Sequence, residues 1–298
     1  MTPKAKTFLE RLFSTVVLLG ILGGTIAWNE PIGYALLIMI LCLLTTWEWF
    51  RMLGERAWQV DRPLILIGGW LYPILLTVGM SSGMSSSSLL VAMVSYLVAF
   101  SLLAFIRQLF RMDYGGRDGA ASLSGMALTL LSFVYPVWLM CFTFLGIALN
   151  EIYLVLWIVL VTKMSDIWAY VSGVLMGGKF FSRKFSPAVS PKKTWEGIMG
   201  SFIITNVCAY FLAVWLLPCS GALLGLTPAV FSLSMAPVLF VLAVWGDLAG
   251  SMIKRGLRVK DSGSLLPGIG GIFDLIDSPS FTLSFYFCLL ACLPFLSL

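Results

Sequence analysis

Long apolar stretches follow one another along almost the whole chain, separated by short polar segments. A run of about 20 apolar residues is long enough to cross a bilayer as a helix. By this measure the pattern predicts about nine membrane-spanning helices, over residues 12–28, 32–50, 63–80, 88–106, 121–147, 152–177, 197–217, 227–250 and 280–297. The fifth is too long for one straight crossing, so we expect it to be tilted or broken near Pro136.

The composition supports this interpretation. Of the 298 residues, 59% are hydrophobic and only 11% are charged, whereas a soluble domain carries about 25% charged residues. The predicted fold class is an all-α polytopic membrane protein with a polar site in its C-terminal half. We divide the chain into N-terminal transmembrane helices, 1–150, and a C-terminal region, 151–298, in which polar residues are denser.

The basic residues predict the orientation in the membrane. If there are nine spans, every Lys and Arg except Lys163 falls on the same side of the membrane. The positive-inside rule then places the N-terminus and the site on the cytoplasmic side of the inner membrane, with the C-terminus outside. The net charge of +5 therefore belongs to one face. Because the basic residues are spread over short loops, we expect no nucleic-acid partner.

Histidine is absent from the chain, and the six cysteines form no CxxC pair. The absence of histidine excludes His-based acid–base catalysis and His-ligated zinc. Five of the cysteines lie within apolar segments, so we interpret them as packing residues without disulfides.

Three charged residues lie inside or near the end of apolar segments. Lys163 and Asp166 are three residues apart, so their side chains can meet on one face of a helix. They form either a self-neutralising structural pair or, for Asp166, the wall of a polar site entered from the cytoplasm. Glu48, between two tryptophans near the end of the second span, is expected to cap or pair there.

The loop that precedes the seventh span has features of an anion site. Ser190 followed by Pro191 predicts a helix N-cap and first helical residue, which places Lys192 and Lys193 in the first turn. A helix start with two lysines suits a phosphate group. The alternative is a basic boundary at the membrane surface.

The densest group of charges lies between Gly246 and Ser278. Asp247, Ser251 and Lys254 fall on one helix face, and Asp274 and Asp277 are spaced to converge on one cation. Carboxylate ligands without His or Cys favour Mg²⁺. Glycines at 268, 270 and 271 allow backbone to approach a phosphate closely. Together these residues predict phosphoryl or nucleotidyl transfer, and the alternative is a solvated loop beside the membrane.

The order of these residues resembles a known signature. The pieces are Ser251-x-x-Lys254-Arg255, Lys260-Asp261-x-Gly263, Leu266-Pro267-Gly268-Ile269-Gly270-Gly271 and Asp274-Leu275-Ile276-Asp277. They are similar to the C-terminal signature of the integral-membrane phosphatidate cytidylyltransferases, the CDP-diacylglycerol synthases. The loop Ser190–Gly197 and Asp166-x-x-Ala169-Tyr170 also resemble this family. Two positions depart from its pattern, since Ile269 replaces a histidine and Leu275 an arginine.

The resemblance implies transfer of CMP from CTP to phosphatidate among membrane lipids, giving CDP-diacylglycerol and pyrophosphate. We expect Mg²⁺ as cofactor, bound by Asp247, Asp274 and Asp277. The expected catalytic residues are Lys254, Arg255, Lys260 and Asp261, the last as a metal ligand or a clamp on a cation. The expected substrate-binding residues are Asp166, Ser190, Lys192, Lys193, Thr194, Ser251, Gly268, Gly270 and Gly271.

Other functions stay open at this point. A transporter or flippase of a phosphorylated lipid would use a similar basic cavity, although no inverted repeat supports it. The replacements Ile269 and Leu275 also leave open an inactive relative or one with another lipid-phosphate acceptor. The motif of the CDP-alcohol phosphotransferases is absent. A second, monovalent cation and a homodimer are both left open.

Overall fold

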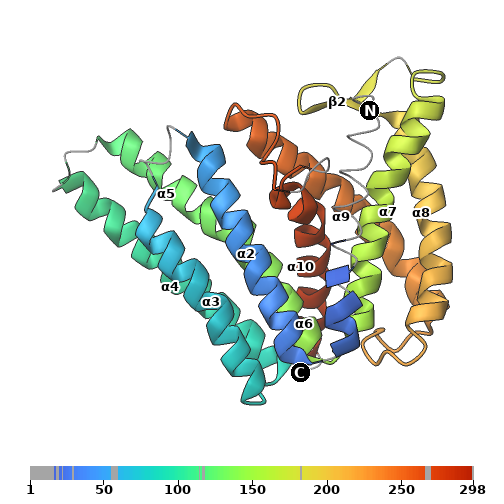
Figure 1. Ribbon diagram of the computed structural model, residues 1–298, viewed down its shortest axis with the longest axis horizontal. Coiled ribbons are helices and arrows are strands. Elements are labelled where there is room, and N and C mark those ends of the chain that lie inside the picture. Colours follow the sequence, from blue (N-terminus) through green and yellow to red (C-terminus); the bar gives the residue numbers. More distant parts are fainter. Residues whose placement is uncertain are drawn as a thin grey trace. The chain divides into compact units, whose positions relative to one another are not determined.

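The computed structural model describes residues 17, 20–21, 23–28, 30–54, 60–113, 115, 118–181, 183–265 and 270–296, with side chains up to residue 292. Within this part of the chain, eight helices are long and apolar enough to cross a membrane. The all-α polytopic class is therefore confirmed (Figure 1). Of the expected first span, 12–28, the structure describes residues 17, 20–21 and 23–28, and all of these are helical; the rest of the span lies outside the described residues.

Two compact units make up the chain. The N-terminal unit contains residues 1–148, 261–274 and 294–298, and the C-terminal unit contains residues 149–260 and 275–293. Segment 261–274, which carries part of the glycine-rich motif, therefore groups with helices from the first half of the chain. The division into regions at residue 150 stays a prediction.

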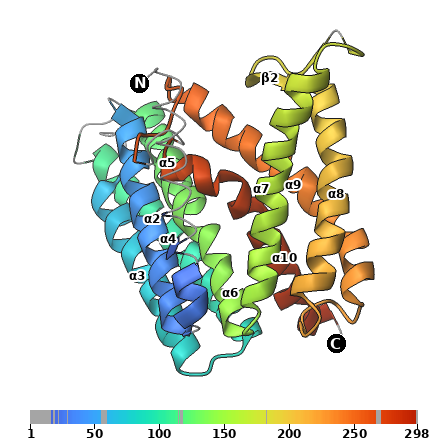
Figure 2. The same ribbon diagram turned by 45° about the vertical axis from the view of Figure 1, so that its right-hand side comes forward.

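The N-terminal unit is a helical bundle whose longest helices lie side by side in both views (Figures 1 and 2). Its helices are α2 (Pro31–Leu53), α3 (Arg62–Ser81), α4 (Ser86–Asp113), α5 (Gly119–Phe133) and α6 (Thr143–Ala148). Between α5 and α6 the chain forms a π-helical turn, Val134–Trp138, and a 3₁₀ turn, Met140–Phe142. Pro136 lies in the π-helical turn and has no N–H to donate, so the expected break near this residue is confirmed.

Aromatic side chains form the core of this unit. The ring of Phe133 stacks on Phe100 with the ring centroids 4.0 Å apart. Trp49 lies against Phe273, at 5.7 Å, and donates an indole N–H to the Ser132 hydroxyl over 2.6 Å. Since Phe273 is completely buried, the end of segment 261–274 packs into the N-terminal bundle.

The C-terminal unit consists of helices and one small hairpin. Its elements are α7 (Ile152–Met176), β1 (Lys184–Ser186), β2 (Ser190–Thr194), α8 (Trp195–Leu216), α9 (Pro228–Gly256) and most of α10 (Ile272–Leu296). Helices α7 and α8 run side by side, and the hairpin lies at one end of the pair (Figures 1 and 2). Small residues allow this close approach, as where the Ser201 hydroxyl donates to the Ser165 carbonyl over 2.6 Å.

The last helix differs from the sequence prediction. We expected it to begin at residue 280, whereas α10 begins at Ile272 and so contains Asp274 and Asp277. The sequence prediction left these two residues out of the span because carboxylates are costly inside a membrane. In the structure, polar groups of the protein surround them. The six cysteines are free, as predicted.

Candidate active site

The first polar pair lies on α7. The ammonium of Lys163 is 3.9 Å from the carboxylate of Asp166, so the two side chains meet as their spacing predicted. About a third of the Asp166 side chain is exposed. The carboxylate therefore has an open side that the lysine does not cover.

A glycine brings a second pair of carboxylates near one another. Gly246 lies at the crossing of α9 with α10, where an added Cβ would stand 2.9 Å from the Ser278 Cα and 3.0 Å from the Asp277 carbonyl oxygen. No side chain fits at this distance without moving a backbone. Because Asp247 follows this glycine directly, the close crossing places Asp247 next to the stretch of α10 that carries Asp277.

Three carboxylates converge here from three helices. Asp166 of α7, Asp247 of α9 and Asp277 of α10 lie close enough for their charges to interact. Asp277 is 3% exposed, and its Oδ1 accepts the backbone N–H of Ser278 over 2.6 Å. Such a group of like charges is costly, and cations beside it lower that cost.

Three lysines supply that positive charge. Lys163 and Lys254 lie within electrostatic range of Asp277. Lys193 forms a direct ion pair with Asp247, and both side chains are largely shielded from solvent. We call the three carboxylates and three lysines the polar cluster. Its formal charge is balanced, so an incoming anion would have to compete with a carboxylate for each lysine.

The position of Lys193 corrects one prediction. Ser190 is not a helix N-cap and Pro191 is not the first helical residue, because Ser190–Thr194 is a β-strand. The cap is Thr194, whose hydroxyl accepts the N–H of Gly197 over 3.1 Å. A proline after serine fits extended backbone as well as a helix start, so the motif alone could not separate them. In the strand, Lys192 is exposed and Lys193 turns to Asp247.

Sequence reasoning missed the part that Glu196 plays in this loop. The side chain is 4% exposed, and its Oε1 accepts backbone N–H groups from Gly178, Phe180 and Phe181 over 2.8–3.0 Å. The carboxylate thus fixes the chain that leaves α7 against the start of α8. The sequence feature that could have revealed this role is an acidic residue in the first turn of an otherwise apolar helix.

Asp274 lies in the N-terminal unit and stabilises the start of α10. Its Oδ2 accepts the Ser262 hydroxyl over 2.8 Å and the N–H of Gly271 at 3.5 Å. A carboxylate that reaches back to the N–H before its own helix is the acidic half of a capping box. Asp274 therefore ties Ser262 and Gly271 to the start of α10, and the position of Gly270 beside it, at φ 126°, is one that a glycine adopts without strain.

Glu48 is the buried side chain that contacts the residues around Gly271. This side chain is completely buried, and its Oε2 accepts the N–H of Phe273 over 2.9 Å. An added Cβ at Gly263 would lie 2.5 Å from Oε1, and one at Gly271 would overlap Oε2 and the Ser262 hydroxyl. The glycines at these two positions thus make room for the carboxylate. The expectation that Glu48 pairs is met by a partner 225 residues away.

The remaining predicted residues lie apart from these contacts. Arg255, Lys260 and Asp261 are exposed, and Ser251 is half-buried on α9. Arg255 donates to the Val259 carbonyl, at 3.5 Å. Gly268 lies outside the described residues. The structure therefore brings Asp166, Asp247, Asp277, Lys193 and Lys254 together but gives the other cations no partner in the cluster.

The donor set of the polar cluster suits a hard cation. Among the described residues, no three Asp, Glu or Cys side chains stand together as a complete metal site. Mg²⁺ does not require one, because proteins usually bind it through one or two carboxylates while water and substrate phosphates supply the other oxygens. Asp247 and Asp277, whose charges interact, are carboxylates of the kind that Mg²⁺ takes as ligands.

Comparisons with known proteins support the same kind of chemistry. The pattern of the cytidylyltransferase family matches residues 9–293. The chain is 28% identical to a phosphatidate cytidylyltransferase of Haemophilus influenzae, over 94% of this chain and 99% of that protein. It is 32% identical to the enzyme of the same name from Mycobacterium bovis, over 83% of this chain and 76% of that protein. A third, from Pseudomonas aeruginosa, is 29% identical over 90% of this chain and 92% of that protein.

These matches extend through the first half of the chain, where the motifs gave no specific signal. They confirm the resemblance inferred from the C-terminal residues. This polytopic helical protein, with carboxylates and lysines gathered from three of its helices and one strand, belongs to the cytidylyltransferase family.

Proposed function

We propose that this protein transfers the cytidylyl group of CTP to phosphatidate and releases CDP-diacylglycerol and pyrophosphate. The observation that carries the proposal is the polar cluster, in which carboxylates of apolar helices lie beside lysines from these helices and from β2 in a cytidylyltransferase family member. The phosphatidate cytidylyltransferases of Haemophilus influenzae and Pseudomonas aeruginosa match this chain over 99% and 92% of their own length.

The reaction needs little acid–base help from the protein. A lipid phosphomonoester has a second pKa of about 6, so its oxygen is already an anionic nucleophile near neutral pH. This oxygen attacks the α-phosphorus of CTP and forms a new P–O bond. The bond between the α-phosphorus and the α,β-bridging oxygen breaks. The electron pair leaves with pyrophosphate. A chain without histidine can therefore catalyse the step by positioning and charge neutralisation.

The lysines of the polar cluster are the groups that neutralise the phosphates. Lys193 lies next to Asp247, so it exchanges this carboxylate for a phosphate oxygen when substrate binds. Lys254, within electrostatic range of Asp277, would make the same exchange. Lys192, Arg255 and Lys260 are exposed near these elements and would bind outer phosphate oxygens.

Asp247 and Asp277 would hold Mg²⁺, and Asp274 is the third ligand we propose, since it is three residues before Asp277 on α10. When bound, the ion would offset the charge of the triphosphate and of the departing pyrophosphate. Asp166 lines the site and holds Lys163 in place. Asp261 would act as a ligand or a clamp on a cation.

The site should face the cytoplasm at the inner membrane. CTP is a cytosolic nucleotide, and the distribution of Lys and Arg favours this orientation. Phosphatidate would reach the site sideways from the bilayer, with its acyl chains between the helices.

The test is incorporation of labelled CTP into lipid by purified protein supplied with phosphatidate. We expect label in the organic phase with Mg²⁺ and none after EDTA. Asp247→Asn should lower kcat/KM at least 100-fold, whereas Asp113→Asn, an exposed aspartate at the end of α4, should leave it unchanged.

Absence of labelled lipid from folded wild-type protein would refute the proposal. Full activity of Asp247→Asn would refute the assignment of the site. Product formation by the wild type would also show that Ile269 and Leu275 are compatible with catalysis.

A further inference from the structure

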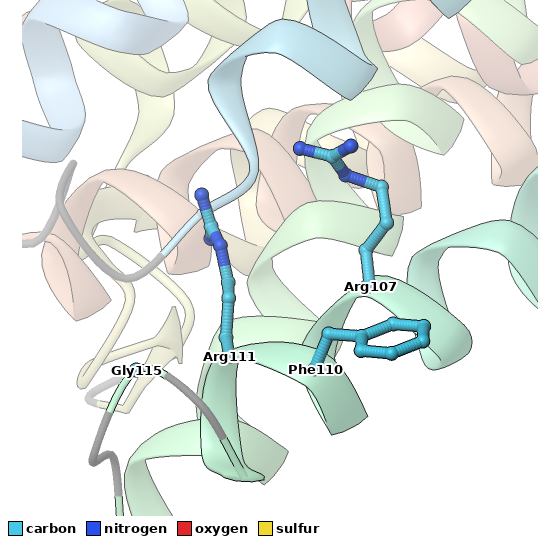
Figure 3. A pocket seen from close by; sticks show the side chains of 4 residues that line it. All are labelled: Arg107, Phe110, Arg111 and Gly115. Atoms are coloured by element: carbon cyan, nitrogen blue, oxygen red, sulfur yellow. The ribbon is translucent and has the colours of Figure 1, made fainter.

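A cationic cavity lies in the N-terminal unit, among residues that the proposed reaction does not use. Its volume is about 450 Å³, and it is lined by Arg107, Phe110, Arg111 and Gly115 (Figure 3). This volume falls in the range typical of sites for small ligands. The two arginines are four residues apart on α4, and their side chains extend in the same direction from the helix (Figure 3).

A buried carboxylate holds both arginines in place. Asp61 is completely buried at the start of α3, where its Oδ1 accepts the N–H of Leu64 over 3.2 Å. Arg107 donates to Asp61 through Nε and, over 3.2 Å, through Nη2. Arg111 lies 3.9 Å from the same carboxylate and donates to the Val60 carbonyl over 3.2 Å. Arginines that only marked the membrane boundary would extend into water instead.

The arrangement has more positive charge than it neutralises. One carboxylate faces two guanidinium groups, and each guanidinium carries five N–H donors in a planar fork. Among the described residues, the contacts to Asp61 and Val60 occupy only a minority of those donors. The side chains of Arg107 and Arg111 are 45% and 28% exposed, so the remaining donors are accessible. A fork of this kind matches the oxygens of a phosphate group.

The surroundings favour a lipid over a free anion. Preceding Arg107 on α4, the large apolar side chains of Leu102, Phe105 and Ile106 are exposed on the outside of the bundle, as on a lipid-facing helix. Phe110, at the cavity itself, is 59% exposed. A ligand in the cavity can therefore place a phosphate against the arginines and acyl chains along the apolar face of the same helix.

We propose that this cavity binds the headgroup phosphate of an anionic phospholipid, at a site separate from the polar cluster. The fixed arginine pair recognises the phosphate, and the exposed apolar face of α4 contacts the acyl chains. The site belongs to the N-terminal unit alone.

The test is native mass spectrometry of detergent-purified protein titrated with short-chain phosphatidylglycerol. Every protein in the comparison carries Lys193→Gln, so that lipid binding at the polar cluster is reduced equally. Arg111→Gln should weaken phosphatidylglycerol binding at least tenfold, because one charge-assisted phosphate contact is lost. Arg107 still neutralises Asp61 in this variant, so the fold is kept.

The matched control is Arg51→Gln. Arg51 also lies at the end of a span in this unit, but its guanidinium stacks over Trp47 at 4.7 Å instead of lining the cavity. This control should bind phosphatidylglycerol as tightly as the parent protein. If Arg111→Gln unfolds, Arg111→Lys replaces it, and the loss of the planar fork should weaken binding several-fold.

Two further probes identify the source of the phosphate. Phosphatidylcholine with the same acyl chains should bind much more weakly, and inorganic phosphate should compete only at far higher concentration. Competition by inorganic phosphate at equal concentration would assign the site to free phosphate. Unchanged phosphatidylglycerol binding by both Arg111 variants, or equal binding of phosphatidylcholine, would overturn the proposal.

Discussion

Replacing Glu48 with alanine should loosen the start of α10 and destabilise the whole N-terminal unit. The substitution removes the acceptor of the buried Phe273 N–H, and a buried donor without a partner costs about 1–3 kcal/mol. It also removes a negative charge from the N-terminus of a helix, worth about 0.3–1 kcal/mol. The space facing Gly263 and Gly271 is left empty as well.

One effect acts in the opposite direction. Burying a carboxylate is costly, and Oε1 of Glu48 has no hydrogen-bond partner among the described residues. Alanine relieves that cost. We therefore expect a net loss of about 2 to 3 kcal/mol rather than the full sum of the lost interactions. Glu48→Gln keeps the shape and a carbonyl acceptor, so it should lose only about 1 kcal/mol.

The assay is hydrogen exchange at the first turn of α10, combined with thermal unfolding in detergent. A loss of 2 kcal/mol corresponds to about 30-fold faster exchange of the Phe273 amide, if exchange follows opening of this segment. The matched control is Glu30→Ala, an exposed glutamate at the start of α2 whose side chain caps no N–H. It should change stability by less than about 0.5 kcal/mol. Normal exchange at Phe273 in Glu48→Ala would refute the reasoning.

Three further predictions test other contacts of the site. Gly246→Ala should reduce kcat/KM at least tenfold, because the new methyl group pushes against the backbone of Ser278, whereas Gly256→Ala, which meets open space, should not. Thr194→Ala should destabilise the start of α8 by about 1 kcal/mol, detected as faster exchange there, and Thr194→Ser should restore it; equal exchange in both would contradict the cap. Glu196→Ala should expose the segment after α7 to limited proteolysis, since three N–H groups lose their acceptor, and an unchanged cleavage pattern would count against this role.

The sequence predicted most of the helices because apolar length alone decides whether a segment can span a membrane. Prediction failed where polar contacts between distant segments decide the outcome. The early start of α10 depends on Glu48, which is remote in the sequence, and no local pattern shows that a carboxylate from α2 accepts the N–H of Phe273.

In the candidate site too, contacts within one helix were predicted, whereas contacts between distant segments were not. The spacing of Lys163 and Asp166 was sufficient to predict their contact, because both lie on one helix. The pair Lys193–Asp247 joins a strand to a helix, and the misassigned helix start at Ser190 hid its geometry. The glycine that brings α9 against α10 was visible in the sequence as Gly246, but a helix partner cannot be deduced from one small residue.

The contact between Glu48 and Phe273 also has a consequence for the order in which the protein is made. Chains grow at about 5–20 residues per second, so the ribosome needs roughly 10 seconds or more to add the residues that separate these two. During that time α2 already exists, while the backbone group that its carboxylate will bind does not. The N-terminal unit can therefore reach its final packing only after nearly all of these residues have been synthesised. The start of α10 completes a unit that the earliest helices began.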